Sequence, residues 1–94
     1  METEFEWDPN KAESNLEKHD VSFAEAATVF FDVFSITVPD PLHSDEENRF
    51  VITGLSHRQR HLVVVHSDRV GRIRIISARL AKPSERKNYE SGIE

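Results

Sequence analysis

The spacing of hydrophobic positions changes about one third of the way along the chain. Up to residue 31, apolar side chains recur every three or four residues. From Val33 onward, they fall in short segments that either alternate with polar residues or form brief continuous runs rich in β-branched residues. The first spacing is typical of amphipathic helices, and alternation is typical of half-buried strands. The pattern therefore predicts two helices followed by several strands.

The start of the first predicted helix is marked by a capping residue. Asp8 can accept hydrogen bonds from free backbone N–H groups, and Pro9 suits the first helical position. Ala12 and Leu16 lie four residues apart and should share one face. We expect this weakly amphipathic helix to end near His19.

The second predicted helix has a stronger start signal. Ser22 and Glu25 have the spacing of a capping box, in which each side chain bonds the backbone of the other residue. The apolar side chains from Phe23 to Phe30 then fall on one face. Asp20 lies between the two helices, at a position where a positive φ is tolerated better by Asp than by most residues. We expect the second helix to pack on a sheet.

Alternating, β-branched segments predict the strands. They cover residues 33–38, 49–55, 60–66 and 72–79, and the last three are joined by short turns typical of an antiparallel meander. Phe5–Trp7 is a short β-like piece, and Pro83 begins a short C-terminal helix. The predicted fold class is α+β: two N-terminal helices on a mainly antiparallel sheet of four to five strands, in one domain over residues 1–94. One face of that sheet would remain uncovered.

Charge is divided unevenly along the chain, although the net charge is only −5. Residues 1–48 hold thirteen acidic and two basic residues, whereas residues 49–87 hold ten Lys or Arg and two acids. Such asymmetry is typical of proteins that contact nucleic acid or an acidic partner. The alternative is a surface on which the acidic half neutralises the basic half within the fold.

Several classes of function are disfavoured by composition. The chain has no cysteine, so disulfides and thiolate metal sites are unavailable, and it has no apolar run long enough to cross a membrane. We expect a cytoplasmic protein without a cofactor. A metal site built from Asp40, His43 and Asp45 is the weaker interpretation of an acidic loop. Trp7 is expected to anchor the core rather than stack on bases.

Arginines on the last predicted strand are the first candidates for chemistry. An arginine fork suits phosphate, and strand alternation places Arg72 and Arg74 on one face. Arg79 would lie on the other face unless a bulge intervenes. For any single arginine, a role in surface solubility is the simpler interpretation. The group that also includes Arg49 and Arg69 is a candidate phosphate-binding set.

The loop from His43 to Arg49 supplies the residue types that metal-free RNA cleavage requires: a base, an acid and a cation. Glu47 or His43 is the candidate base. The alternative is an ordinary solvated loop. Among the histidines of the basic half, His66 is the candidate acid, and His57 and His61 are expected to be ordinary strand or surface residues.

Four blocks of sequence together carry a resemblance to a known family. They are F-E-W-D-P-N-K-A-E-S-N-L-E-K-H, V-S-F-A-E-A-A-T-V-F, D-P-L-H-S-D-E-E-N-R-F, and R-I-R-I-I-S-A-R with its basic tail. In this order they resemble the BrnT toxins of bacterial type II toxin–antitoxin systems over about residues 5 to 90. The resemblance implies a RelE-like fold, endoribonuclease activity and a BrnA-like ribbon-helix-helix antitoxin. That complex, such as a heterotetramer, would repress its own promoter, with the DNA contacted through the antitoxin.

The resemblance also implies functional roles for the five sheet arginines and for His43 and Glu47; His66, Lys82 and Arg86 join them from their place in the basic half of the chain. The expected catalytic residues are Arg74, Arg79, Arg72, Glu47, His43 and His66; the expected RNA-binding residues are Arg49, Arg69, Lys82 and Arg86. Three positions depart from the family pattern: Asp20 replaces a Gly, Lys82 a Thr and His66 a Tyr. The competing interpretation is a non-catalytic protein that binds an antitoxin and acts as a corepressor.

Overall fold

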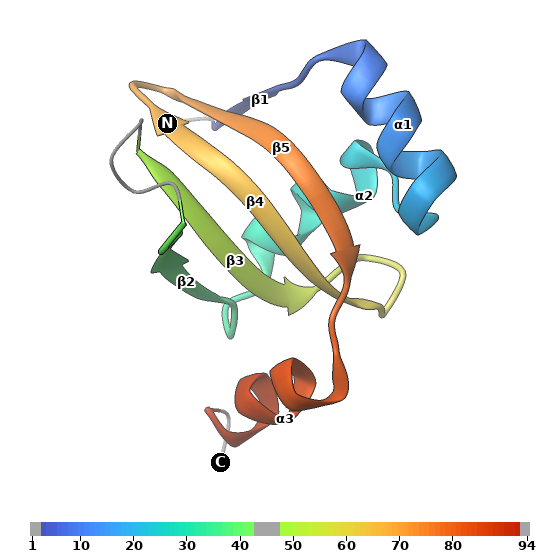
Figure 1. Ribbon diagram of the computed structural model, residues 1–94. Coiled ribbons are helices and arrows are strands. Elements are labelled where there is room, and N and C mark those ends of the chain that lie inside the picture. The colour runs from blue at the N-terminus through green and yellow to red at the C-terminus, as the bar shows by residue number, and fades with distance from the viewer. Residues whose placement is uncertain (1–2, 43–47, 93–94) are drawn as a thin grey trace.

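One twisted sheet forms the framework of the computed structural model, which describes residues 3–42 and 48–92. Its five strands have the spatial order β1-β5-β4-β3-β2 (Figure 1). They are β1 (Glu4–Glu6), β2 (Ile36–Pro39), β3 (Arg49–Leu55), β4 (His61–Arg69) and β5 (Arg72–Leu80). β1 runs parallel to β5, and the other neighbouring pairs are antiparallel. The predicted α+β class with a mainly antiparallel sheet is confirmed.

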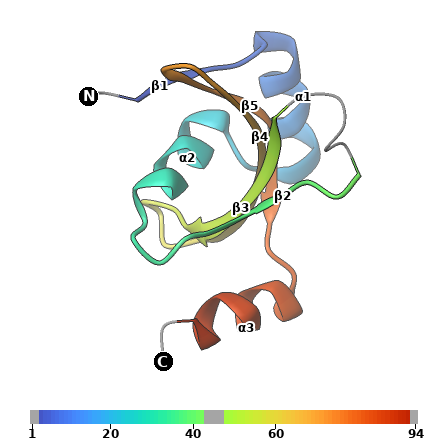
Figure 2. The same cartoon turned by 90° about the vertical axis from the view of Figure 1, so that its left-hand side faces the viewer.

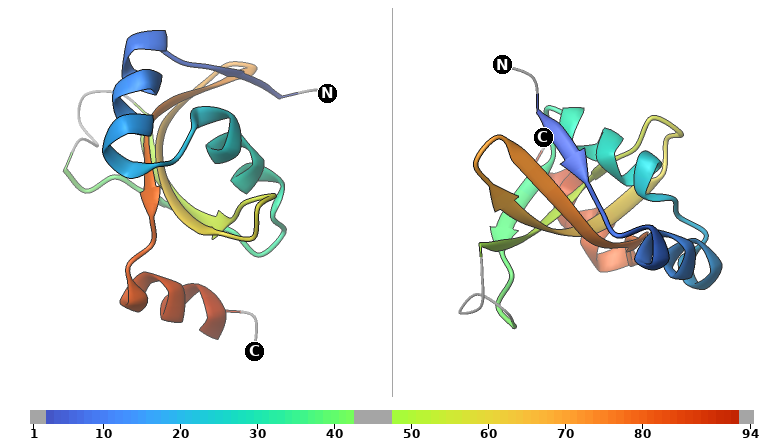
Figure 3. Two further views of the ribbon diagram at one scale, coloured as in Figure 1. Left: turned by 90° about the vertical axis from the view of Figure 1, so that its right-hand side faces the viewer. Right: turned by 90° about the horizontal axis from the view of Figure 1, so that it is seen from above.

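The helices occupy three different places around this sheet. They are α1 (Pro9–His19), α2 (Phe23–Thr28), which continues as a 3-10 turn over Val29–Phe31, and α3 (Pro83–Ser91). α2 lies across one face of the sheet, whereas α1 runs alongside β5 at the sheet's edge (Figures 2 and 3). α3 lies beyond the end of β5. We call the face opposite α2 the open face.

The core fills the space between α2 and the sheet. Phe23, Ala26 and Val29 from the helical segment are buried against side chains of β3, β4 and β5. Those strand residues are Ile52, Leu62, Val64, Ile75 and Ala78. Trp7 packs edge-on against Phe23 with ring centroids 6.0 Å apart, in agreement with its predicted role as an anchor.

The caps of α1 form as predicted, but its buried position differs. The Asp8 carboxylate accepts a hydrogen bond from the Asn10 N–H at 2.8 Å, and Asp20 ends the helix with a φ of 57°. Leu16 is 48% exposed, so the expected apolar face is wrong at that position. The residue that α1 buries is Asn15.

Asn15 fastens α1 to the edge of β5. Its side-chain Nδ2 donates to the carbonyls of Ala78 at 2.8 Å and Val21 at 3.0 Å, and its Oδ1 accepts from the Ala78 N–H at 3.1 Å. β1 pairs with β5 only through Arg74. Beyond that point the amide of Asn15 takes the place of a neighbouring strand, because it provides hydrogen-bond partners for the buried backbone N–H and C=O of Ala78.

The capping box predicted at α2 forms only in part. Ser22 Oγ accepts from the Glu25 N–H at 3.0 Å, as expected. The Glu25 carboxylate does not return to the cap; it accepts from Ser56 Oγ at 2.7 Å and forms an ion pair with Arg60. Arg60 and Ser56 hold the pKa of Glu25 below its usual value, against the opposing effect of burial. A buried carboxylate is better matched by a guanidinium than by a single N–H.

The strands differ from the predicted segments mainly at their ends. β2 begins at Ile36 because Asp32 accepts hydrogen bonds from the N–H groups of Phe34 and Leu55 and holds a turn before it. β4 continues to Arg69, three residues beyond the predicted end, and the hairpin to β5 has only Val70 and Gly71 at its tip. Gly71 has a φ of +74°, which suits a two-residue hairpin.

A β-bulge in β5 decides which arginines share a face. Val65 pairs with Ser77 and His66 pairs with Ile75, so Ile76 is an extra residue. Residues directly opposite in an antiparallel pair share a face. Arg79 lies opposite Val63 and Arg74 lies opposite Ser67. The bulge therefore brings Arg79 to the open face together with Arg72 and Arg74, which simple alternation would not do.

Candidate functional site

A hollow of about 520 Å³ occupies the open face. Its floor is apolar and consists of valines from three strands: Val38, Val51, Val63 and Val65. Charged side chains line the same hollow, namely Asp40, Arg49, Arg79 and Glu85. A hollow of this kind can accept an apolar or aromatic group on its floor while cations at its rim bind an anion.

Arg79, a cation of this hollow, is paired with Glu85. Its Nη1 and Nη2 donate to the two carboxylate oxygens of Glu85 at 2.8 Å and 2.9 Å. Glu85 also accepts from the Lys82 N–H at 2.8 Å, which fixes the start of α3. Arg79, followed by this backbone bond, lowers the pKa of Glu85 to about 2. Glu85 is therefore ionised at neutral pH and fixes the Arg79 guanidinium, whose Nη1 also donates to the Leu80 carbonyl at 3.2 Å. The Nε–H and one Nη2 N–H of Arg79 are outside these bonds, and the side chain is 36% exposed.

Arg72 and Arg74 lie on the open face but are matched by acids of β1. The parallel register sets Glu4 beside Arg72 and Glu6 beside Arg74. Arg74 Nη1 lies 3.0 Å from Glu6 Oε2, and Arg72 contacts Glu6 at 3.4 Å and Glu4 at 3.8 Å. Hydrogen bonding from Arg74 keeps the pKa of Glu6 below its usual value. A ligand that bound these arginines would compete with Glu4 and Glu6.

The remaining sequence-predicted cations fall in three places. Arg49 lines the hollow and Arg69 lies at the exposed end of β4, and each has further interactions of its own. Lys82 and Arg86 are exposed at the start of α3. The structure thus brings Arg49 and Arg79 to one hollow, while the other predicted cations are outside its lining.

His66 does not fit the role of acid that the sequence indicated. It is 5% exposed and points to the helix-covered side, where its ring meets Phe30 at 4.7 Å and Phe50 at 5.8 Å. Its Nδ1 is buried and has no hydrogen-bond partner among the described residues. Burial lowers the pKa of His66. We correct that prediction: His66 is a core residue, separated by the sheet from the arginines.

His43 and Glu47, the predicted base candidates, lie outside the described residues. The weak Asp40–His43–Asp45 metal site also falls partly there. Within residues 3–42 and 48–92, no group of three His, Cys, Asp or Glu side chains is arranged to hold a metal ion. His57 is exposed beside Thr28, and His61 packs edge-on against Tyr89 at 5.3 Å. Both are ordinary surface or packed residues, as expected.

Comparison with known protein families shows the family to which this chain belongs. A family model described as "Ribonuclease toxin, BrnT, of type II toxin-antitoxin system" matches residues 7–85. The chain belongs to the BrnT family. The predicted membership is therefore confirmed, and with it the general class of ribonuclease toxin with an antitoxin partner.

The BrnT fold is also found by structural comparison. The crystal structure of the Brucella abortus ribonuclease toxin BrnT matches this chain with a TM-score of 0.68 and 19% sequence identity. The match covers 86% of this chain and 99% of the Brucella chain. Comparison with curated protein sequences gives no match. None of the helices in the described parts of this BrnT chain is long and apolar enough to span a membrane.

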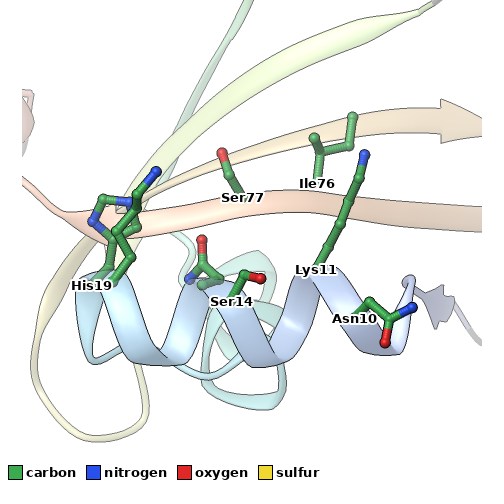
Figure 4. A pocket seen from close by; sticks show the side chains of 8 residues that line it. Asn10, Lys11, Ser14, His19, Ile76 and Ser77 are labelled. Atoms are coloured by element: carbon green, nitrogen blue, oxygen red, sulfur yellow. The ribbon is translucent and has the colours of Figure 1, made fainter.

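A second hollow of this BrnT protein, beside α1, was missed by the sequence interpretation. It measures about 320 Å³ and lies between α1 and the bulge of β5 (Figure 4). Lys11, Ser14, Lys18 and His19 line it, with Asn10, Asn15, Ile76 and Ser77 completing its wall. The signal available in the sequence was the seven-residue interval between the lysines, which places both on one side of a helix.

Proposed function

We propose that this protein is a metal-independent endoribonuclease toxin that cleaves RNA at the open-face hollow. The observation that carries the proposal is the Arg79–Glu85 pair, which fixes a guanidinium in a valine-floored hollow that Arg49 also lines. The membership of the BrnT family supports the ribonuclease class. A base could lie on the apolar floor while its phosphate meets the arginines.

In the proposed mechanism, the RNA itself supplies the nucleophile. A base, Glu47 or His43, removes the proton of a 2′-hydroxyl, and the resulting oxygen attacks the adjacent phosphorus. The bond from phosphorus to the 5′-oxygen breaks, which leaves a 2′,3′-cyclic phosphate and a 5′-oxyanion that takes up a proton to become a 5′-hydroxyl. Arg79 and Arg49 stabilise the additional negative charge on the phosphate oxygens in the transition state. His66 takes no part in this step, because it is buried on the helix-covered side of the sheet.

Glu85 and the paired arginines have supporting roles in this proposal. With a pKa of about 2, Glu85 is too weak a base to compete with Glu47 or His43 near neutral pH, and its role is to position Arg79. Arg72 and Arg74 bind neighbouring phosphates of the RNA by exchanging Glu4 and Glu6 for the ligand. The exposed cations Arg69, Lys82 and Arg86 add to the attraction of the polyanion.

Arg79 variants test the proposed site. Replacement by Ala should lower the rate constant of RNA cleavage about 10²–10³-fold, because the transition state loses a preorganised charged donor. Arg79→Lys should restore activity only in part, because an ammonium cannot bind two oxygens in the plane of a fork. Lys87→Ala, an exposed change on the same helix as Glu85, is the matched control. Full cleavage by Arg79→Ala would remove this residue from the site.

The partners in the proposal follow from the toxin–antitoxin class. A BrnA-like antitoxin would cover the open face, and the complex, such as a heterotetramer, would bind the promoter through the antitoxin. Growth arrest on expression of this chain alone, relieved by co-expression of a ribbon-helix-helix antitoxin, tests this part.

A non-catalytic corepressor is the second candidate. It is favoured by the ion pairs of Arg72 and Arg74 with Glu4 and Glu6, because these carboxylates neutralise the positive charge that would otherwise attract RNA. On this alternative, the valine-floored hollow receives an apolar side chain of the antitoxin. Purified protein that represses its promoter with the antitoxin but leaves RNA intact would favour the corepressor.

A further inference from the structure

We infer that the hollow beside α1 is a second RNA-binding subsite, in which Lys11 and Lys18 bind backbone phosphates of the strand that leaves the cleavage site. This inference rests on the proposed function and extends it. It assigns a ligand class, the phosphodiester backbone of single-stranded RNA, to residues outside the open-face hollow.

The first observation is that the two lysines have no internal partner. Neither Lys11 nor Lys18 forms an ion pair or side-chain hydrogen bond in the described structure, whereas Arg60, Arg72, Arg74 and Arg79 all bind carboxylates. A cation without an internal partner can bind an external anion without first losing a partner.

The second observation is the way α1 separates its charges. At 3.6 residues per turn, Lys18 lies almost directly above Lys11, roughly 10 Å along the axis. Ser14 and Asn15, the two residues that lie between them on this side, are uncharged, so no acid is available at helical spacing between them. Of the acids of α1, Glu13 falls on the opposite side of the helix, and Glu17 lies roughly 100° around the axis from Lys18.

The position of Lys11 is unfavourable for the helix itself. Lys11 occupies the first turn of α1, where the positive end of the helix dipole disfavours a cation. Lys18 and His19, in the last turn, are explained equally well by the favourable interaction with the negative end. Lys11 has no such structural explanation, and its place on the wall of a hollow supplies a functional one.

The third observation is continuity with the proposed cleavage site. Ile76 and Ser77 line both hollows, so the bulge of β5 forms the boundary between them. Figure 4 shows Lys11, Ser14 and His19 on the side of α1 that faces these two strand residues. Asn15 fixes the wall by its bonds to Ala78. A strand with its scissile phosphate at Arg79 can therefore continue past Ser77 along α1.

The salt dependence of RNA binding tests this subsite. A 2′-O-methyl RNA of about twelve nucleotides cannot be cleaved by 2′-hydroxyl attack and spans a typical binding path. Loss of two phosphate contacts in Lys11→Ala/Lys18→Ala should reduce the slope of log K against log salt by about 1.4, which corresponds to about 25-fold weaker binding near 0.1 M salt. Lys11→Arg/Lys18→Arg should retain the slope, and Lys87→Ala should change it by less than half a unit.

A short substrate separates this inference from the proposed function. The double alanine variant should cleave an RNA of about three nucleotides at the wild-type rate, because such a substrate does not reach α1. An unchanged slope with normal cleavage by the wild type would overturn the subsite alone. Weakened binding of the antitoxin with unchanged RNA binding would overturn it too, and would assign the surface to the protein partner. A wild type that neither binds nor cleaves RNA would overturn both proposals.

Discussion

Replacement of Asn15 by Ala should destabilise the protein more than any change of a single apolar contact on α1. The amide makes three hydrogen bonds to the backbone of Ala78 and Val21, and both of these residues are fully buried. Each bond contributes about 1 kcal/mol net, and an unsatisfied buried group costs about 1–3 kcal/mol. Water entering from the hollow beside α1 can satisfy part of what is lost, so we expect a cost of about 3 kcal/mol.

This magnitude is large relative to the whole fold. A chain of 94 residues has a free energy of unfolding of about 5–14 kcal/mol. A loss of about 3 kcal/mol should lower the midpoint of thermal unfolding by about 12–24 °C. Urea unfolding should show a lower midpoint with an unchanged m-value, because the folded core is the same.

Two further variants locate the effect in the donor groups. Asn15→Asp keeps an acceptor for the Ala78 N–H but turns a carboxylate toward two carbonyl oxygens, so at neutral pH it should cost at least as much as Ala. Ser14→Ala, a change at the exposed neighbour of Asn15 on α1, should alter stability by less than about 0.5 kcal/mol. A cost below about 1 kcal/mol for Asn15→Ala would refute the role of this amide as a substitute strand.

Two other predictions follow from buried positions. Gly54→Ala should cost about 1–3 kcal/mol in urea unfolding, because its Cβ would meet Val29 Cγ1 at 2.9 Å and Ser35 Cβ at 3.0 Å. Gly71→Ala meets nothing and should cost only the strain of its positive φ, about 1–2 kcal/mol. A Gly54→Ala variant as stable as the wild type would contradict this packing. The lowered pKa of His66 means that the unfolded chain binds a proton more readily, so stability present above about pH 6.5 should fall as the pH drops below that value, by up to about 1.4 kcal/mol per pH unit. His66→Phe should remove that part of the pH dependence in unfolding measured from pH 7 to 5, and an unchanged slope would argue against a buried neutral imidazole.

Local signals in the sequence predicted most of the helix and strand positions. The caps at Asp8 and Ser22 and the β-branched alternation from Arg49 to Leu55 depend on near neighbours, and these elements form where expected. The parallel strand β1 was harder to place, because its partner lies nearly seventy residues away. Glu25 illustrates the same limit: its local capping role is overridden by Arg60 and Ser56, which only the folded chain brings near.

The same limit applies to the candidate site. The sequence indicated the arginines, but their partners depend on strand register: Glu6 is set beside Arg74 by β1, and Glu85 reaches Arg79 from α3. The face of Arg79 depended on a single extra residue, Ile76, which alternation alone does not reveal. Lys11 was overlooked because a polar helix side is usually solvent-exposed without further function.

The central proposal is that this protein cleaves RNA without a metal ion, by attack of the RNA's own 2′-hydroxyl on the adjacent phosphate. Mass spectrometry of the fragments formed by purified protein and RNA in excess EDTA tests it most directly. We predict fragments that end in a 2′,3′-cyclic phosphate and begin with a 5′-hydroxyl, with a strongly reduced yield for Arg79→Ala. Intact RNA, cleavage that chelation abolishes, or fragments with 5′-phosphate ends would contradict it.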